Sequence, residues 1–234
     1  MPEIELICLA NSRKLVGRCV AGLRTDGGGW VRPVRDSLDG MLFPQDYDLG
    51  DRQEAALLDV IRVPVSAPRP EFHQPENWLH TAGRWELVRR IPAALAGRLL
   101  APALNPGPEL LGDRHDRVPC ELFLDRPAFA SLALVEPRTI QWQIRAGVRG
   151  NRQTRARFEL RGQRYNLAVT DPAFEERSLH LGEGFHPRGA DGIAPADRVL
   201  LTVSLGEPLP ATGDCFKLIA AVIVLPRAAA APRA

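Results

Sequence analysis

Several residues near the start of the chain have side chains that could bind a polyanion. They are Ser12, Arg13, Lys14, Arg18, Trp30 and Arg32. Hydroxyl, backbone N–H, ammonium and guanidinium groups presented by one loop can hold phosphate oxygens together. Strand parity places Trp30 and Arg32 on one face, where an indole could stack on a base while the guanidinium holds its phosphate. The alternative is that the indole covers the core and the arginine stem covers the indole.

A second basic segment spans residues 138–164. It contains eight arginines and one acid, Glu159, in a chain whose net charge is only +2. The candidate binding residues here are Arg145, Arg149, Arg152, Arg155 and Arg157, and strand parity turns Arg145, Arg157, Arg161 and Arg164 outward. Contacts of this kind predict an affinity that falls steeply with salt. The alternative is a solvated face that is neutralised by acids such as Glu175 or Glu176.

Asn77 is a further candidate, in an expected loop over residues 72–78. An asparagine amide can read a base edge in two hydrogen bonds, but it can equally cap its own turn, and we favour the structural role. The five histidines are scattered without metal-ligand spacing, and the sequence has no phosphate-binding glycine loop. We therefore expect no catalytic residues, no metal and no cofactor, and we expect that the protein is not an enzyme.

Composition indicates a folded globular chain. Of the 234 residues, 45% are hydrophobic and 25% are charged. The four cysteines are far apart with no CxxC pair, so we expect neither a disulfide framework nor a zinc site. No apolar run approaches the ~20 residues of a membrane-spanning helix, and the N-terminus lacks a signal-peptide pattern. These features predict a cytoplasmic protein without membrane contact.

The elements that position the candidates are mainly strands. In the first half we expect strands over residues 4–9, 17–22, 30–34 and 57–65, with a glycine turn at 27–29. In the second half, strict alternation predicts antiparallel strands over 139–145, 157–161 and 164–170, with Trp142 on the buried face beside Ile140 and Ile144. Asp171 followed by Pro172 predicts the start of a helix. Two further strands are expected over 199–205 and 215–225.

This order of elements predicts the fold class. Three strands, a short helix and two strands form the five-stranded Greek-key OB barrel. We expect a mostly β protein of two tandem OB-like barrels with short helices, although SH3-like or PUA-like barrels stay open for the first half. The expected boundaries are a first domain over residues 1–100, a Pro/Gly-rich connector over 101–127, a second domain over 128–226 and a disordered tail over 227–234.

Four segments of the chain resemble the bacterial dual OB-containing domain family. They are CLANSRKLVGRCVAG, GGGWVRPVRD, LLDVIRVPV and QPENW, in which the matching residues are Ser12, Arg13, Lys14, Gly17, Arg18, Trp30, Arg32, Pro33, Asn77 and Trp78. The resemblance covers most of the chain, but its motifs lie in the first hundred residues. It implies two consecutive OB-like units that bind nucleic acid.

Together these observations predict a module that binds single-stranded DNA or RNA with weak sequence specificity. By family analogy, it would act with a nuclease or helicase partner. One alternative is a protein–protein adaptor, whose binding would resist charge reversal of the arginines. Another is a sensor of a small nucleotide, which would bind mononucleotides and show little preference for longer strands.

Overall fold

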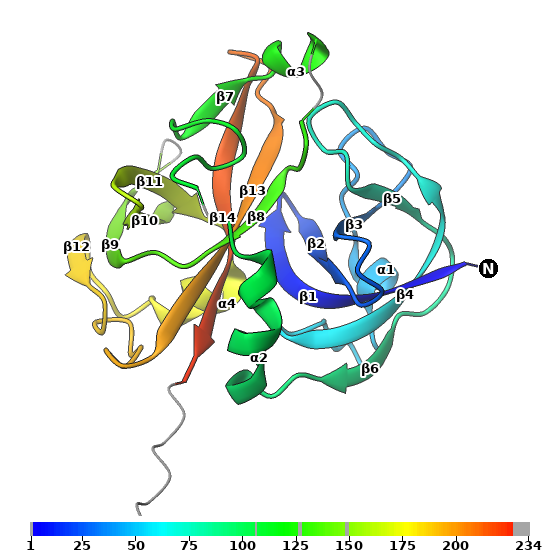
Figure 1. Ribbon diagram of the computed structural model, residues 1–234, viewed down its shortest axis with the longest axis horizontal. Helices are drawn as coiled ribbons and strands as arrows, with labels where there is room; N and C mark the ends of the chain where they lie inside the picture. The colour runs from blue at the N-terminus through cyan, green and yellow to red at the C-terminus, as the bar shows by residue number, and fades with distance from the viewer. Residues whose placement is uncertain (1, 106, 126–127, 148–149, 227–234) are drawn as a thin grey trace, which may run out of the picture.

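The computed structural model describes residues 2–105, 107–125, 128–147 and 150–226. Strands dominate the chain, which has four short α-helices and one 3-10 helix within these ranges (Figure 1). The elements of the first half are β1 (Glu3–Lys14), β2 (Gly17–Arg24), β3 (Trp30–Val34), α1 (Pro44–Tyr47), β4 (Asp59–Pro68), β5 (Asn77–His80), β6 (Glu86–Arg90), α2 (Ala93–Leu100) and η1 (Ala101–Ala103).

Five strands of the first half close into a barrel. Their order is β1-β2-β3-β5-β4, and β4 pairs back with β1, so the sheet has no gap. The β3–β5 pairing is parallel and the others are antiparallel. With α1 between β3 and β4, this is the Greek-key order of an OB barrel. It confirms the predicted fold class and decides against the other small barrels considered for this half.

The second half repeats this plan with one change. Its elements are β7 (Arg117–Pro119), α3 (Leu122–Asp125), β8 (Leu132–Val135), β9 (Thr139–Ala146), β10 (Arg152–Leu160), β11 (Gln163–Val169), α4 (Pro172–Arg177), β12 (Gly184–Pro187), β13 (Arg198–Pro208) and β14 (Asp214–Leu225). The sheet order is β12-β9-β10-β11-β14-β13-β8. Only residues 136–138 separate β8 from β9, so the two act as one interrupted first strand, with Pro137 at the break.

Helix α4 follows β11 as the sequence predicts. The Asp171 carboxylate accepts hydrogen bonds from the backbone N–H groups of Ala173 (3.0 Å) and Phe174 (3.3 Å), and Pro172 occupies the first turn. A second Asp171 oxygen accepts from the N–H of Val222 on β14 at 2.8 Å. The cap therefore also fixes the helix against the sheet, and it does so from a buried position.

The two halves share a hydrophobic core. One cluster joins Ile7 and Leu9 of β1 to Leu200 of β13 and to Ala221 and Ile223 of β14. Side chains of α2 complete this cluster, and α2 lies between the halves in Figure 1. Hydrogen bonds also cross the seam, from Thr202 Oγ1 to the Leu9 carbonyl at 2.6 Å and from the Arg13 N–H to the Thr170 carbonyl at 2.8 Å. The barrels are consequently packed against each other through buried surface.

Part of the expected connector over residues 101–127 has regular structure. Strand β7 pairs with β14, with Val118 opposite Cys215, and α3 follows it. A disulfide joins Cys120 to Cys215, whose Cα atoms are 5.6 Å apart. The expectation of no disulfide was wrong, because the two cysteines are 95 residues apart in sequence and meet only through the β7–β14 pairing. The expected tail, 227–234, lies outside the described residues.

Candidate nucleic-acid interface

The cations of the β1–β2 hairpin have carboxylate partners in the structure. The Arg13 guanidinium forms an ion pair with Glu175 of α4 at 2.8 Å. The Lys14 ammonium pairs with Glu207 of β13 at 2.9 Å and also donates to the Asp39 carbonyl. Two of these three contacts therefore come from the second barrel.

The other two hairpin candidates are also engaged. Arg18 binds both oxygens of Glu54, with its Nε 2.8 Å and its Nη2 3.2 Å from the carboxylate. The Ser12 side chain is buried, and its hydroxyl donates to the Cys19 carbonyl at 3.4 Å. Ser12 thus offers no hydroxyl to a phosphate, contrary to the sequence prediction.

Arg32 is buried, with 2% of its surface exposed. Its guanidinium pairs with Glu76 at 2.9 Å and donates to the hydroxyls of Ser131 (2.7 Å) and Ser204 (3.2 Å). These two serines belong to the second half of the chain. The prediction that Trp30 and Arg32 share an exposed binding face was wrong, because Arg32 joins the two halves and Trp30 is half-buried against the shared core.

Asn77 is also buried, at the start of β5. Its Nδ2 donates to Gln74 Oε1 at 3.3 Å, and Gln74 in turn donates to the Leu205 carbonyl of β13 at 3.2 Å. The base-reading role proposed for Asn77 is not available from this position, and the structural role that we favoured agrees with the packing.

Glu207 lies at the centre of these contacts between the halves. It accepts from Lys14 Nζ at 2.9 Å and contacts His73 Nε2 at 2.7 Å. Burial alone raises the pKa of the Glu207 carboxyl, but the hydrogen bond from His73 and the charge of Lys14 outweigh that effect and lower the pKa to about 2. In OB barrels the β1–β2 and β4–β5 loops flank the ligand face. In the first barrel, the end of β1 next to the first of these loops and residues of the β4–β5 loop bind the second barrel.

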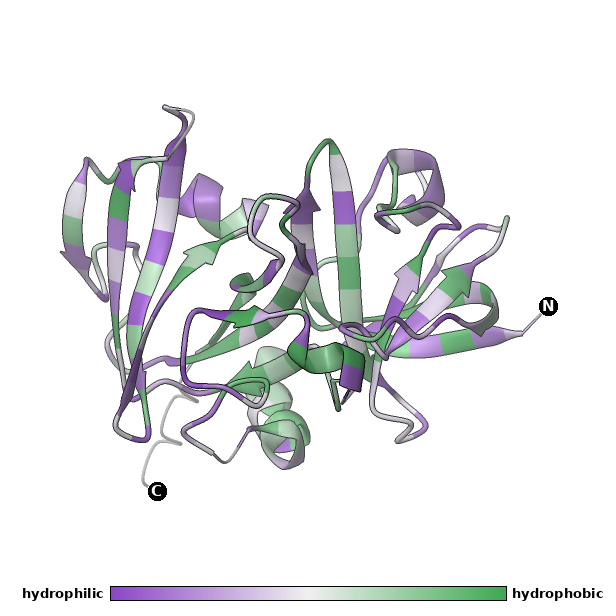
Figure 2. Cartoon of the chain, turned by 90° about the horizontal axis from the view of Figure 1, so that it is seen from above, coloured by the Kyte–Doolittle hydropathy of each residue, from purple (hydrophilic) through white to green (hydrophobic). Residues whose placement is uncertain are grey.

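The outward face of β9, β10 and β11 is different. Residues alternate between buried and exposed along all three strands, and hydropathy alternates with them (Figure 2). The exposed side of this face carries Arg145, Arg157 and Arg164, with amide side chains between them. Trp142 points to the core, as its parity predicts, and is fully buried.

The strand register fixes the spacing of these arginines. Arg157 of β10 lies opposite Gln141 of β9 and Asn166 of β11, whereas Arg145 lies opposite Gln153. Gln153 and Arg157 are four residues apart on β10, so Arg145 and Arg157 are separated by about 13 Å along the strand direction. Within the described parts of the chain, Arg145, Arg157 and Arg164 form no ion pair with a carboxylate. Glu159 of β10 lies opposite Arg164 on this face, so the face keeps a net positive charge that is available to a ligand.

An exposed aromatic ring stands at the edge of this face. Phe185 of β12, opposite Gln143 of β9, is 52% exposed, and the Arg157 guanidinium lies 5.0 Å from its ring centre. Sequence reasoning missed Phe185, because β12 has only four residues within a glycine-rich segment. An aromatic residue flanked by glycine in a long loop is the signal that could have identified it.

Two further candidate arginines of the basic segment, Arg155 and Arg152, have polar partners in the structure. Arg155 lies on the same face and donates to the side-chain oxygen of Asn166 at 2.9 Å. Burial is the main cause that lowers the pKa of the Arg155 guanidinium, and the nearby positive charge of Arg145 adds to it. Arg152 donates to the carbonyls of Ser178 (2.6 Å) and Leu181 (2.8 Å) and so fastens β10 to the end of α4. Arg149 lies outside the described residues.

A shallow depression of about 440 Å³ opens on this face between Gln141, Arg157, Arg164 and Asn166. Its amide and guanidinium groups suit the edges and phosphates of nucleotides. Within the described ranges, no group of three or more His, Cys, Asp or Glu residues is arranged to hold a metal ion. No helix there has the length and hydropathy needed to cross a membrane.

Comparisons with known proteins agree with this architecture. The sequence model of the dual OB-containing domain matches residues 4–222, which is nearly the whole chain. Comparison with curated proteins and comparison with solved structures each found no match. The match spans both barrels, including the second one, where the sequence offered no recognisable motif. On this evidence the chain belongs to the dual OB-containing domain family.

Proposed function

We propose that the chain binds single-stranded nucleic acid on the outward face of β9, β10 and β11. The observation that supports this most directly is the set of exposed cations Arg145, Arg157 and Arg164 beside the ring of Phe185. A polyanion gains from several unneutralised guanidinium groups on one surface, and an exposed ring can stack on an unpaired base. Membership of an OB family is consistent with this ligand class.

The position of the face supports the same conclusion. In OB barrels, the face of the second and third strands contacts oligonucleotides. Strands β10 and β11 are the second and third strands of the second barrel, counted from β9. Because the first barrel uses its own hairpin cations to bind Glu175 and Glu207, the second barrel carries the main ligand surface in this proposal.

Weak sequence specificity follows from the chemistry of the contacts. Guanidinium groups that hold phosphates position a strand but read no sequence, and stacking tolerates every base. Such a binding module would deliver nucleic acid to other proteins, for which a nuclease or a helicase is the partner we propose. We assign it no catalytic step.

The test is fluorescence anisotropy with labelled single-stranded and duplex DNA and RNA at two salt concentrations. A variant with Arg145→Glu, Arg157→Glu and Arg164→Glu should lose binding to single strands. The slope of log affinity against log salt should fall in magnitude by roughly 0.7 for each lost phosphate contact.

A matched control is available in the first barrel. Arg52, Arg89 and Arg98 are exposed, and none of them forms an ion pair with a described residue. Their reversal to glutamate changes the net charge by the same amount, so it separates a local site from a general charge effect. Equal loss of binding in both triple variants, or salt-insensitive binding in the wild type, would overturn the proposed site.

A further inference from the structure

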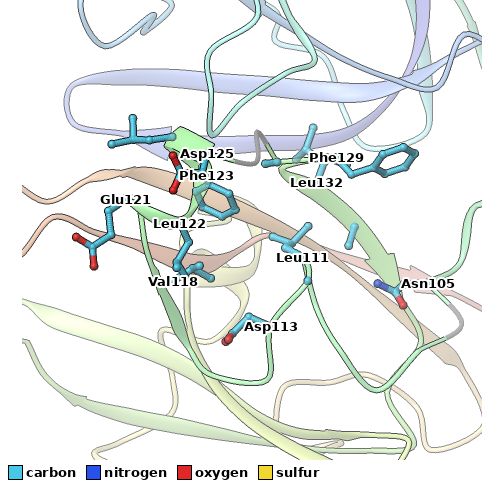
Figure 3. A pocket seen from close by; sticks show the side chains of 15 residues that line it. Asn105, Leu111, Asp113, Val118, Glu121, Leu122, Phe123, Asp125, Phe129 and Leu132 are labelled. Atoms are coloured by element: carbon cyan, nitrogen blue, oxygen red, sulfur yellow. The ribbon is translucent and has the colours of Figure 1, made fainter.

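A large apolar groove lies beside α3, between β7 and β8. Its volume is about 990 Å³, which is at the upper end of the range for ligand sites. Figure 3 shows Leu111, Leu122, Phe123 and Leu132 around it, with Phe129 at its edge. Figure 1 places α3 at the opposite side of the second barrel from β12, so the groove is separate from the basic face.

Three large apolar side chains at this groove are in contact with solvent. Leu122 is 57% exposed, Leu124 is 67% exposed and Phe129 is fully exposed. Single exposed apolar residues are common on protein surfaces, but a cluster that lines a groove marks an interaction site. Covering these side chains would remove apolar surface from water, which is favourable.

The charge at the groove is negative. The described residues that line it include three acids, Asp113, Glu121 and Asp125, but no lysine, arginine or histidine. Asp113 is held by Lys217 at 3.4 Å and His115 at 3.1 Å, whereas Glu121 and Asp125 form no ion pair with any described residue. In a chain with 28 arginines, this surface is unsuited to nucleic acid and complementary to a cation.

The floor of the groove is preformed. Phe123 and Val118 pack with Leu205 and with the disulfide-bonded pair Cys120 and Cys215 in a small separate core. Phe72, from the β4–β5 loop of the first barrel, packs against the same core. A surface that is fixed before binding loses little conformational entropy when it is covered.

We propose that this groove binds a short apolar segment of a partner protein that carries lysine or arginine at its ends. The segment's apolar side chains would fill the space between Leu111, Phe123 and Phe129, and its cations would pair with Glu121 and Asp125. The charge complementarity selects this occupant over a nucleic acid or an acidic peptide.

The test is phage display of random 16-residue peptides on the 234-residue chain. Enriched peptides should combine two or more large apolar residues with flanking lysine or arginine. As labelled synthetic peptides, they should lose at least about tenfold in affinity for the variant Leu122→Ser, Leu124→Ser, Phe129→Ser. The affinity of these peptides for the variant Glu121→Lys, Asp125→Lys should fall by a similar factor, and this loss of affinity should be larger at low salt than at high salt.

The control variant is Leu95→Ser, Leu99→Ser on α2, where two leucines of similar exposure lie outside the groove. All substituted residues are exposed, and thermal unfolding verifies that each variant is folded. The proposal fails if no peptide is enriched, if enriched peptides lack basic residues, or if they bind the groove variants as tightly as the wild type. The protein could instead associate with itself in a concentration-dependent way that the groove variants abolish. That result would overturn the proposal, because the groove would then bind a second copy of this chain and not a partner segment.

Single-stranded DNA provides a cross-check. The Leu122→Ser, Leu124→Ser, Phe129→Ser variant, which leaves the net charge unchanged, should bind it as the wild type does, and the Arg145, Arg157 and Arg164 variant should keep its peptide affinity. The two proposals can therefore fail independently.

Discussion

Arg32 shows how burial changes what a cation can do. Its guanidinium is surrounded by the Glu76 carboxylate and two serine hydroxyls, and it lies between the two halves of the chain. Desolvating such a pair is costly, and removing one partner leaves the other charge buried without compensation. Arg32, which the sequence suggested as a phosphate ligand, therefore stabilises the contact between the two halves of the chain.

A first prediction concerns this pair. Arg32→Met should lower the free energy of unfolding by about 3–5 kcal/mol, because Glu76 would be left buried without its cation. The double variant Arg32→Met, Glu76→Met should lose less stability than the single variant, because no buried charge is left without its partner. Urea unfolding monitored by fluorescence measures both. A double variant that is less stable than the single variant would contradict the assignment.

A second prediction concerns Glu207 and pH. Its pKa is about 2 in the folded chain against 4.5 for an ordinary glutamate, so its charged form stabilises the folded state. This contribution is fully present above pH 4.5 and is lost as the pH falls toward 2. Glu207→Gln should therefore be less stable than the wild type at pH 7, and the difference should shrink below pH 4.5. Urea unfolding at several pH values tests this, and a difference that does not change with pH would rule it out.

The individual site residues of the first barrel could not be predicted from local sequence. Arg13 and Lys14 have the composition of a phosphate-binding loop, but their partners Glu175 and Glu207 come from the other half of the chain. Only the packing of the two barrels brings these carboxylates to the hairpin. By contrast, Arg145, Arg157 and Arg164 lie on three strands, and the outward position of each followed from the alternation of residues within its own strand.

At the scale of elements, alternation was the most informative pattern. It predicted β9, β11, the second half of β10 and the buried position of Trp142, because one face of these strands is solvated and the other packs on a core. The strands β5 and β12 have four residues each and were missed. A strand of four residues is too short for the two-residue alternation of buried and exposed side chains to be recognised. Such a strand forms because a neighbouring strand offers it hydrogen-bonding partners.

A third prediction belongs to β12. Phe185→Ala should weaken binding of single-stranded nucleic acid by about fivefold or more, since stacking of one base on an aromatic ring contributes about 1–3 kcal/mol. Binding of duplex should change little. Anisotropy titrations measure both affinities. Phe129→Ala, which removes an exposed ring elsewhere, is the matched control and should leave the nucleic-acid affinity unchanged.

For the whole molecule, the sequence predicted two barrels but not how they are joined. The order of strands and helix was sufficient for the OB assignment, because that order is encoded locally. The shared core and the Cys120–Cys215 disulfide depend on residues far apart in sequence, such as Leu9 and Ile223, which carry no local sign of their contact. The expectation of two units separated by a connector therefore understated their mutual burial.

A fourth prediction concerns the disulfide. Reduction, or the variant Cys120→Ser, Cys215→Ser, should lower the free energy of unfolding by roughly 2–4 kcal/mol, because the cross-link restricts the unfolded chain. Nucleic-acid affinity should not change, since the basic face is on other strands. Thermal unfolding with and without reductant measures the first effect. Cys19→Ser, which removes a free thiol, is the control and should leave the reductant effect intact.

The shared core also affects the order of events during synthesis. The strands of the first barrel leave the ribosome well before β13 and β14, which complete the seam on which Ile7 and Leu9 are buried. At ordinary translation speeds the interval is on the order of ten seconds. Throughout that time the nascent barrel exposes an apolar surface, and Arg13 and Lys14 have not yet paired with Glu175 and Glu207 of the second barrel, so the emerging chain is transiently more prone to association than the finished protein.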